Sequence, residues 1–157
     1  MLINIVGFNL CWFGLVWFGN DFIPFACLFL LMHLYYSNVR REHLLIITIT
    51  FTGILVDSLL YGFGFYQFEQ LGHIPFWLMV LWACFATTIA HSLHFLSVSK
   101  CWQMIVGAMF VPLSYIAGYQ FGAVVFSHPI LISYVALSLI WCLLLPLFFL
   151  FKKHITA

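Results

Sequence analysis

Asp57 has the clearest chemical meaning of any residue in this chain, because it is an acidic side chain within a long apolar stretch. A charged side chain at the centre of a bilayer costs about 2.5–3.5 kcal/mol on insertion scales. Asp57 is therefore expected to face other parts of the protein. There it can act as a proton relay, general acid/base or cation ligand, or it can fix helix packing by accepting hydrogen bonds. Both roles stay open, and Asp57 is the first candidate catalytic residue.

His91 is the second candidate catalytic residue. It follows Thr87 and shares a predicted helix face with His94, and Thr88 lies beside them. Thr87, Thr88 and His33 are candidate ligand-binding residues. A single HxxH pattern without HExxH predicts no metal site. No cofactor is expected either, with haem held between His33 and His91 as a minor alternative, because histidine is a haem ligand.

Further ligand-binding candidates lie on other apolar stretches: Tyr115, Ser114, Trp82 and Asn9. At about 1.5 Å of rise per residue, Asp57 and Tyr115 lie at similar depth, roughly 20 Å from the nearest basic residues. By the same count, His33 and His91 lie only roughly 6–9 Å from the ends of their predicted helices that are nearest the basic residues. The polar residues are thus predicted to form two layers. Direct contact between Asp57 and His91 is not expected.

The composition of the chain indicates what kind of protein must position these residues. The chain is 66% hydrophobic and 6% charged, whereas soluble domains are about 45–50% apolar and 25% charged. This composition is typical of an integral membrane protein. Nearly all of the 157 residues lie in apolar runs, which leaves no room for a soluble catalytic or nucleic-acid-binding domain.

The apolar runs divide into six segments, each near the roughly 20 residues that a membrane-crossing helix needs. We predict helices near residues 2–19, 22–38, 43–62, 75–97, 102–126 and 130–151. The predicted fold is an all-α bundle of six transmembrane helices, with residues 1–157 forming a single domain. The glycines of the fifth helix, Gly107, Gly118 and Gly122, are expected to allow close helix approach.

The basic residues support this count. Arg40, Arg41, Lys100, Lys152 and Lys153 all fall on one side of the membrane if the chain crosses six times. Basic residues are enriched in cytoplasmic connections. Both termini are therefore expected in the cytoplasm, and the protein is expected to be a multi-pass protein of a bacterial inner membrane.

Several segments together resemble an uncharacterised family of small bacterial inner-membrane proteins. The resemblance is carried by residues 9–13, 53–59, 75–82, 85–93, 112–118 and 122–123. It implies no established reaction or cofactor. It implies a gene neighbourhood with methyltransferases similar to cyclopropane-fatty-acid synthases and with flavin amine-oxidase-like proteins, and hence a role in handling lipid acyl chains.

The leading hypothesis is a protein with a polar-floored intramembrane pocket that binds, or helps to modify, a lipid acyl chain or a similar apolar molecule. Whether it is itself an enzyme stays open. The expected partners are membrane lipids, a membrane-associated lipid-modifying enzyme and a second copy of the chain, but no nucleic acid. The alternatives are a small-solute or proton-coupled transporter or substrate-capture subunit, and a structural subunit of a membrane complex.

Overall fold

The computed structural model describes residues 2–68 and 72–157. The described chain is mainly helical, with a single pair of two-residue strands among its described residues. In chain order the elements are α1 (Leu2–Phe18), η1 (Gly19–Phe22), α2 (Ile23–Tyr36), α3 (Glu42–Gly62), β1 (Tyr66–Gln67), α4 (Phe76–Ala90), η2 (His94–Val98), α5 (Lys100–Gln120), β2 (Val125–Phe126) and α6 (Ile130–Ile155).

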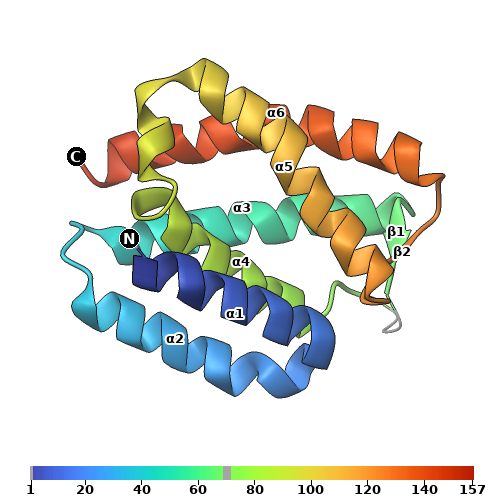
Figure 1. Ribbon diagram of the computed structural model, residues 1–157, viewed down its shortest axis with the longest axis horizontal. Coiled ribbons are helices and arrows are strands. Elements are labelled where there is room, and N and C mark those ends of the chain that lie inside the picture. The colour runs from blue at the N-terminus through green and yellow to red at the C-terminus, as the bar shows by residue number, and fades with distance from the viewer. Residues whose placement is uncertain (1, 69–71) are drawn as a thin grey trace.

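The helices form a bundle around α4. The α1 and α2 helices fold back on each other as a hairpin through η1, and α5 pairs with α6 on the other side of the bundle (Figure 1). The α4 helix packs against α1, α2, α3 and α6. Both chain termini lie at the same end of the bundle, and the two short strands lie at the opposite end (Figure 1).

The chain is an all-α membrane protein. Four helical stretches are long and apolar enough to cross a membrane: Leu2–Tyr36, Glu42–Gly62, Lys100–Gln120 and Ile130–Ile155. The first of these is the α1–α2 hairpin, and the shorter α4 is also apolar. Large apolar side chains such as Phe51 and Leu131 are exposed on the outside, as expected for surfaces that face lipid.

The α4 helix ends earlier than its sequence suggests. The predicted helix of residues 75–97 is replaced by α4, a turn that begins at His91, and η2. The hydroxyls of Thr87 and Thr88 donate to the carbonyls of Cys84 and Phe85. Such side-chain bonds compete with the helical backbone pattern. Because of the break, His94 does not continue the face that carries Thr87.

The α5 helix also ends early, at Gln120 instead of near residue 126. Gly122 adopts a positive φ of 76°, and the N–H of Ala123 donates to the carbonyl of Gly118, as in a glycine-terminated helix. The freed segment forms β2, which pairs antiparallel with β1. The two connections at this end of the bundle are thereby joined. The α6 helix continues further than predicted, to Ile155.

Candidate functional site

Asp57 is fully buried and accepts three side-chain hydrogen bonds from three different elements. Its Oδ1 accepts from the hydroxyl of Tyr66 on β1 at 2.6 Å and from that of Tyr115 on α5 at 3.1 Å. Its Oδ2 accepts from Nε1 of Trp82 on α4 at 2.7 Å. We call these four residues the Asp57 network. Asp57 is 0% exposed, so the carboxylate is satisfied inside the bundle as predicted.

Tyr66 reaches Asp57 because the β1–β2 pairing folds its connection back over the end of the bundle. Burial raises the pKa of Tyr66 above its usual range, so its hydroxyl keeps the proton that it donates. On the other side of Asp57, the Trp82 ring packs where Gly53 has no side chain: a Cβ there would lie 2.0 Å from the indole. Gly53 therefore makes the room that Trp82 needs to reach the carboxylate.

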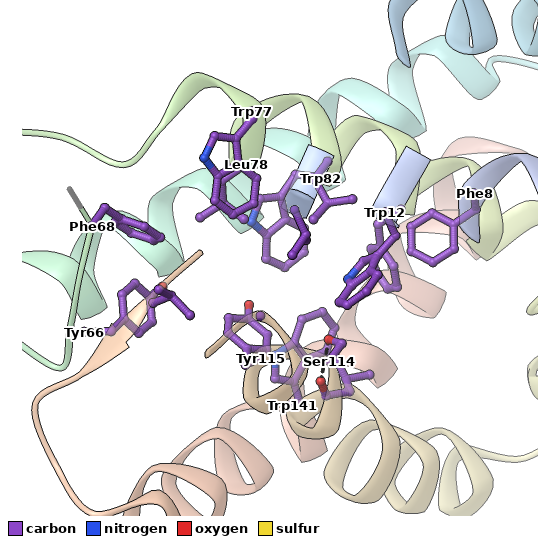
Figure 2. Close-up of a pocket in the computed structure, with 16 residues that line it drawn as sticks. Phe8, Trp12, Tyr66, Phe68, Trp77, Leu78, Trp82, Ser114, Tyr115 and Trp141 are labelled. Atoms are coloured by element: carbon purple, nitrogen blue, oxygen red, sulfur yellow. Dashed lines mark hydrogen bonds between the residues drawn. The ribbon is translucent and has the colours of Figure 1, made fainter. Parts of the chain in front are cut away.

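The three donors to Asp57 also line a cavity. The cavity is partly open, and its volume is about 90 Å³. Side chains from α1, β1, α4, α5 and α6 surround it (Figure 2). The lining is mainly aromatic and aliphatic, and it includes Phe8, Trp12, Tyr66, Trp77, Trp82, Ser114, Tyr115 and Trp141.

A second hollow adjoins this cavity near the η1 end of the bundle. It is lined by residues of α1, η1 and the connections around Pro75 and Gly122. Val16, Phe68 and Trp77 line both spaces. The apolar cavity and the second hollow therefore share a wall.

A second polar cluster lies at the opposite end of the bundle, around Glu42. Glu42 is the first residue of α3 and is 2% exposed. Its Oε1 lies 3.0 Å from Nε2 of His33 and 2.9 Å from Nε2 of His91. Its other oxygen accepts a hydrogen bond from the hydroxyl of Ser37. We call Glu42, His33 and His91 the Glu42 cluster.

Local geometry brings these groups together. The α2 helix ends one turn after His33, where the N–H of Ser37 donates to the carbonyl of His33. Arg41, in the left-handed region at φ 55°, then turns the chain into α3. His91 is the first residue after α4. The end of α2, the turn at Arg41 and the end of α4 thus each position one side chain of the Glu42 cluster.

Asn4 connects the Glu42 cluster to α1 and α4. Its Nδ2 donates to Oγ1 of Thr87 at 2.9 Å and lies 3.5 Å from Nδ1 of His33. Its Oδ1 accepts from the hydroxyl of Ser92 at 2.7 Å. Asn4 is buried, so this amide fixes the position of α1 against both histidine-bearing segments.

The structure divides the predicted site residues between these two places. Trp82 and Tyr115 join Asp57, and Ser114 lines the cavity with them. His33 and His91 join Glu42, with Thr87 adjacent through Asn4. Asp57 and His91 lie in separate networks, in agreement with the depth count. Thr88 is buried, and its hydroxyl donates to a backbone carbonyl of α4. Asn9 is exposed and donates to the carbonyl of Ile5.

Three residues of these networks are absent from the sequence prediction: Glu42, Asn4 and Tyr66. Glu42 lies beside Arg40 and Arg41 in a polar connection, where an acidic residue is ordinarily a surface charge. Asn4 lies near the start of the chain, and Tyr66 lies in an aromatic connection typical of the membrane interface. The spacing of nine residues between His33 and Glu42 gives no helical or metal-type signal.

Comparison with known proteins confirms the resemblance to an uncharacterised family. No curated protein and no solved structure matches the chain. Residues 1–147 match the model of the family described as "Protein of unknown function (DUF2878)", and the chain belongs to this family.

Proposed function

We propose that this protein binds a lipid acyl chain, or an apolar molecule of similar shape, in the cavity between α1, α4 and α5. The observation that carries the proposal is the lining of the cavity, which is mainly aromatic and aliphatic with few polar groups. Ligand sites are typically apolar clefts in which a few polar groups fix orientation. The hydroxyls of Tyr115 and Ser114 would serve that purpose at one wall.

Asp57 acts in this proposal as a positioning residue. It does not line the cavity, but it accepts hydrogen bonds from Tyr66, Trp82 and Tyr115, which do. One carboxylate thereby holds side chains from β1, α4 and α5 in fixed orientations. The lipid-handling role would be carried out alone or beside a membrane-associated lipid-modifying enzyme.

The proposal includes a location and a topology. The six α-helices cross the bacterial inner membrane, with both termini in the cytoplasm. Two features support this orientation: the termini share one end of the bundle (Figure 1), and all five basic residues lie in the α2–α3 connection, at the start of α5 or near the end of α6. Basic connections favour the cytoplasmic side.

The test is the amount of acyl chain that stays with the protein through purification. Ser114→Phe places a bulky ring in the cavity, whereas Leu113→Phe places the same ring on the outer face of α5, where Leu113 is 50% exposed. Both proteins are washed in the same detergent, and the retained lipids are measured by mass spectrometry. We expect stoichiometric lipid in the wild type and in Leu113→Phe, and a clear loss in Ser114→Phe.

Equal retention in the two variants would contradict the proposal, because the retained lipid would then lie on the outer surface. Size-exclusion profiles of both variants show whether the added ring has disturbed folding. Gly118→Leu, which fills the cavity from another position of α5, provides an independent obstruction.

A second candidate function is transport of a small solute. It is favoured by the wall shared between the cavity and the second hollow, since Val16, Phe68 and Trp77 line both. Solute or proton flux in proteoliposomes, lost in Ser114→Phe and retained in Leu113→Phe, would favour transport over lipid binding.

A further inference from the structure

We propose that His33, Glu42 and His91 bind one divalent transition-metal ion, with zinc as the reference ion. Two imidazoles and one carboxylate form a donor set that proteins use for zinc and for non-haem iron. This site is separate from the apolar cavity and does not depend on the acyl-chain proposal.

The spacing of the ligand atoms fits a single ion. The two imidazole Nε2 atoms lie 3.0 and 2.9 Å from Oε1 of Glu42, and the ligand atoms of all three residues lie within 4.8 Å of one another. Ligands at about 2.0–2.2 Å from a tetrahedral zinc ion are themselves roughly 3.3–3.6 Å apart. Small rotations of three side chains therefore convert the cluster into a coordination shell.

The charge of the cluster also favours a cation. Glu42 is 2% exposed, and among the described residues its ion-pair contacts are the two histidines, with no lysine or arginine. A charged partner or a metal ion is one means by which proteins compensate a buried carboxylate. A divalent ion would balance the carboxylate and use the imidazole lone pairs at the same time.

The surroundings of the cluster resemble the outer shell of a metal site. The hydroxyl of Ser37 donates to the carboxylate oxygen that does not face the histidines. Contacts of this kind orient metal ligands. The His91 side chain is 24% exposed, against 8% for His33. The exposed flank at His91 offers an entry path and an open coordination position.

The same geometry favours a single ion over haem. Oε1 of Glu42 is within hydrogen-bond distance of both histidine Nε2 atoms. The iron of a haem bound between these histidines would have to displace this carboxylate, and the porphyrin would need the space around it.

The test uses full-length protein without a histidine tag, treated with a chelator and then titrated with Co²⁺, whose visible absorption reports coordination. Zn²⁺ is added afterwards in competition. His33→Gln and His91→Gln each remove one ligand. His43→Gln is the matched control, because His43 is an exposed histidine next to Glu42 in the sequence and is not part of the cluster.

We expect one Co²⁺ per chain, displaced by Zn²⁺, and unchanged binding in His43→Gln. Loss of outer-shell partners typically weakens metal binding about 10–100-fold, so loss of a ligand in either test variant should weaken it at least about tenfold. Absence of saturable binding in the wild type would overturn the proposal, as would equal affinity in all variants that elute as folded protein. A strong Soret band lost in His33→Gln would instead assign the histidines to haem.

Discussion

At the scale of residues, the two buried carboxylates of the described chain have neighbours of different kinds. Asp57 accepts hydrogen bonds from two phenols and an indole, which all act as donors there. Glu42 faces two imidazoles. The first arrangement orients side chains, and the second gathers ligands. A carboxylate therefore supports packing at one end of the bundle and, in the proposed metal site, ion binding at the other.

Asp57→Asn tests the orienting role. An asparagine amide offers one acceptor oxygen, so its NH₂ group must face either the Trp82 N–H or the two tyrosine hydroxyls. A buried donor left without an acceptor costs about 1–3 kcal/mol. We expect the variant to insert normally, to unfold more readily by about that amount in mixed micelles, and to lose lipid retention. Unchanged stability and retention would show that the carboxylate is dispensable.

The sequence was sufficient to predict that Asp57 is buried and that Tyr115 lies at its depth, because an acidic residue within an apolar helix requires polar neighbours. It identified Trp82 only as a ligand-binding candidate and did not pair it with Asp57. It was not sufficient to identify Glu42. A carboxylate in a basic connection is buried only if the chain turns so that two helix ends close over it. That closure depends on the Arg41 turn and on the end of α4, neither of which has a periodic signal.

At the scale of elements, the six predicted helices all have counterparts, because long apolar runs leave few alternatives to helix. The predicted ends of α4 and α5 were wrong, and the reason is local. Threonine hydroxyls and a glycine in the left-handed region end these helices, whereas hydrophobic periodicity continues through both points. The α4 helix itself packs against α1, α2, α3 and α6, whereas much of η2 after it is exposed.

The glycines of α5 differ in what they do. Gly122 ends the helix, and a Cβ at Gly118 would meet only an ordinary contact, 3.7 Å from Val124. A Cβ at Gly107, in contrast, would lie 2.4 Å from the carbonyl oxygen of Trp141 on α6. The sequence predicted a close helix approach for α5 without naming its partner, and the structure places this approach at Gly107, against α6.

Gly107→Ala tests this contact. A backbone carbonyl cannot move aside as a side chain can, so the two helices must separate. We expect destabilisation of about 1–3 kcal/mol, the usual cost of overpacking, measured by unfolding in mixed micelles. Gly62→Ala is the matched control, because a Cβ there meets nothing within 4 Å. Similar stabilities for the two variants would show that α5 and α6 do not depend on this approach.

At the scale of the whole molecule, composition alone was sufficient to identify a helical membrane protein. The arrangement of the helices could not be derived from composition, because lipid-facing and protein-facing apolar side chains are chemically alike. The polar contacts of Asn4, Glu42 and Asp57 distinguish the interior from the lipid-facing surface. These few residues carry much of the information that specifies the bundle.

The proposed topology is testable with single cysteines in a background without native cysteines. Arg40→Cys lies in the α2–α3 connection, and Asp21→Cys lies in the exposed turn between α1 and α2. With a membrane-impermeant maleimide, we expect Asp21→Cys to react in intact cells and Arg40→Cys to react only after the inner membrane is opened. Reaction of both cysteines from the same side would contradict six crossings.

The α4 helix connects the apolar cavity to the Glu42 cluster. It carries Trp82 in the wall of the cavity and leads directly into His91, with roughly 14 Å of helical rise between them. A short helix behaves as a stiff rod, so a displacement at one end moves the other. Thermodynamic linkage is reciprocal: whatever factor a bound chain imposes on ion affinity, the ion imposes on chain affinity. With both proposed ligands, the sign of that coupling would decide whether the molecule binds them together or exchanges one for the other.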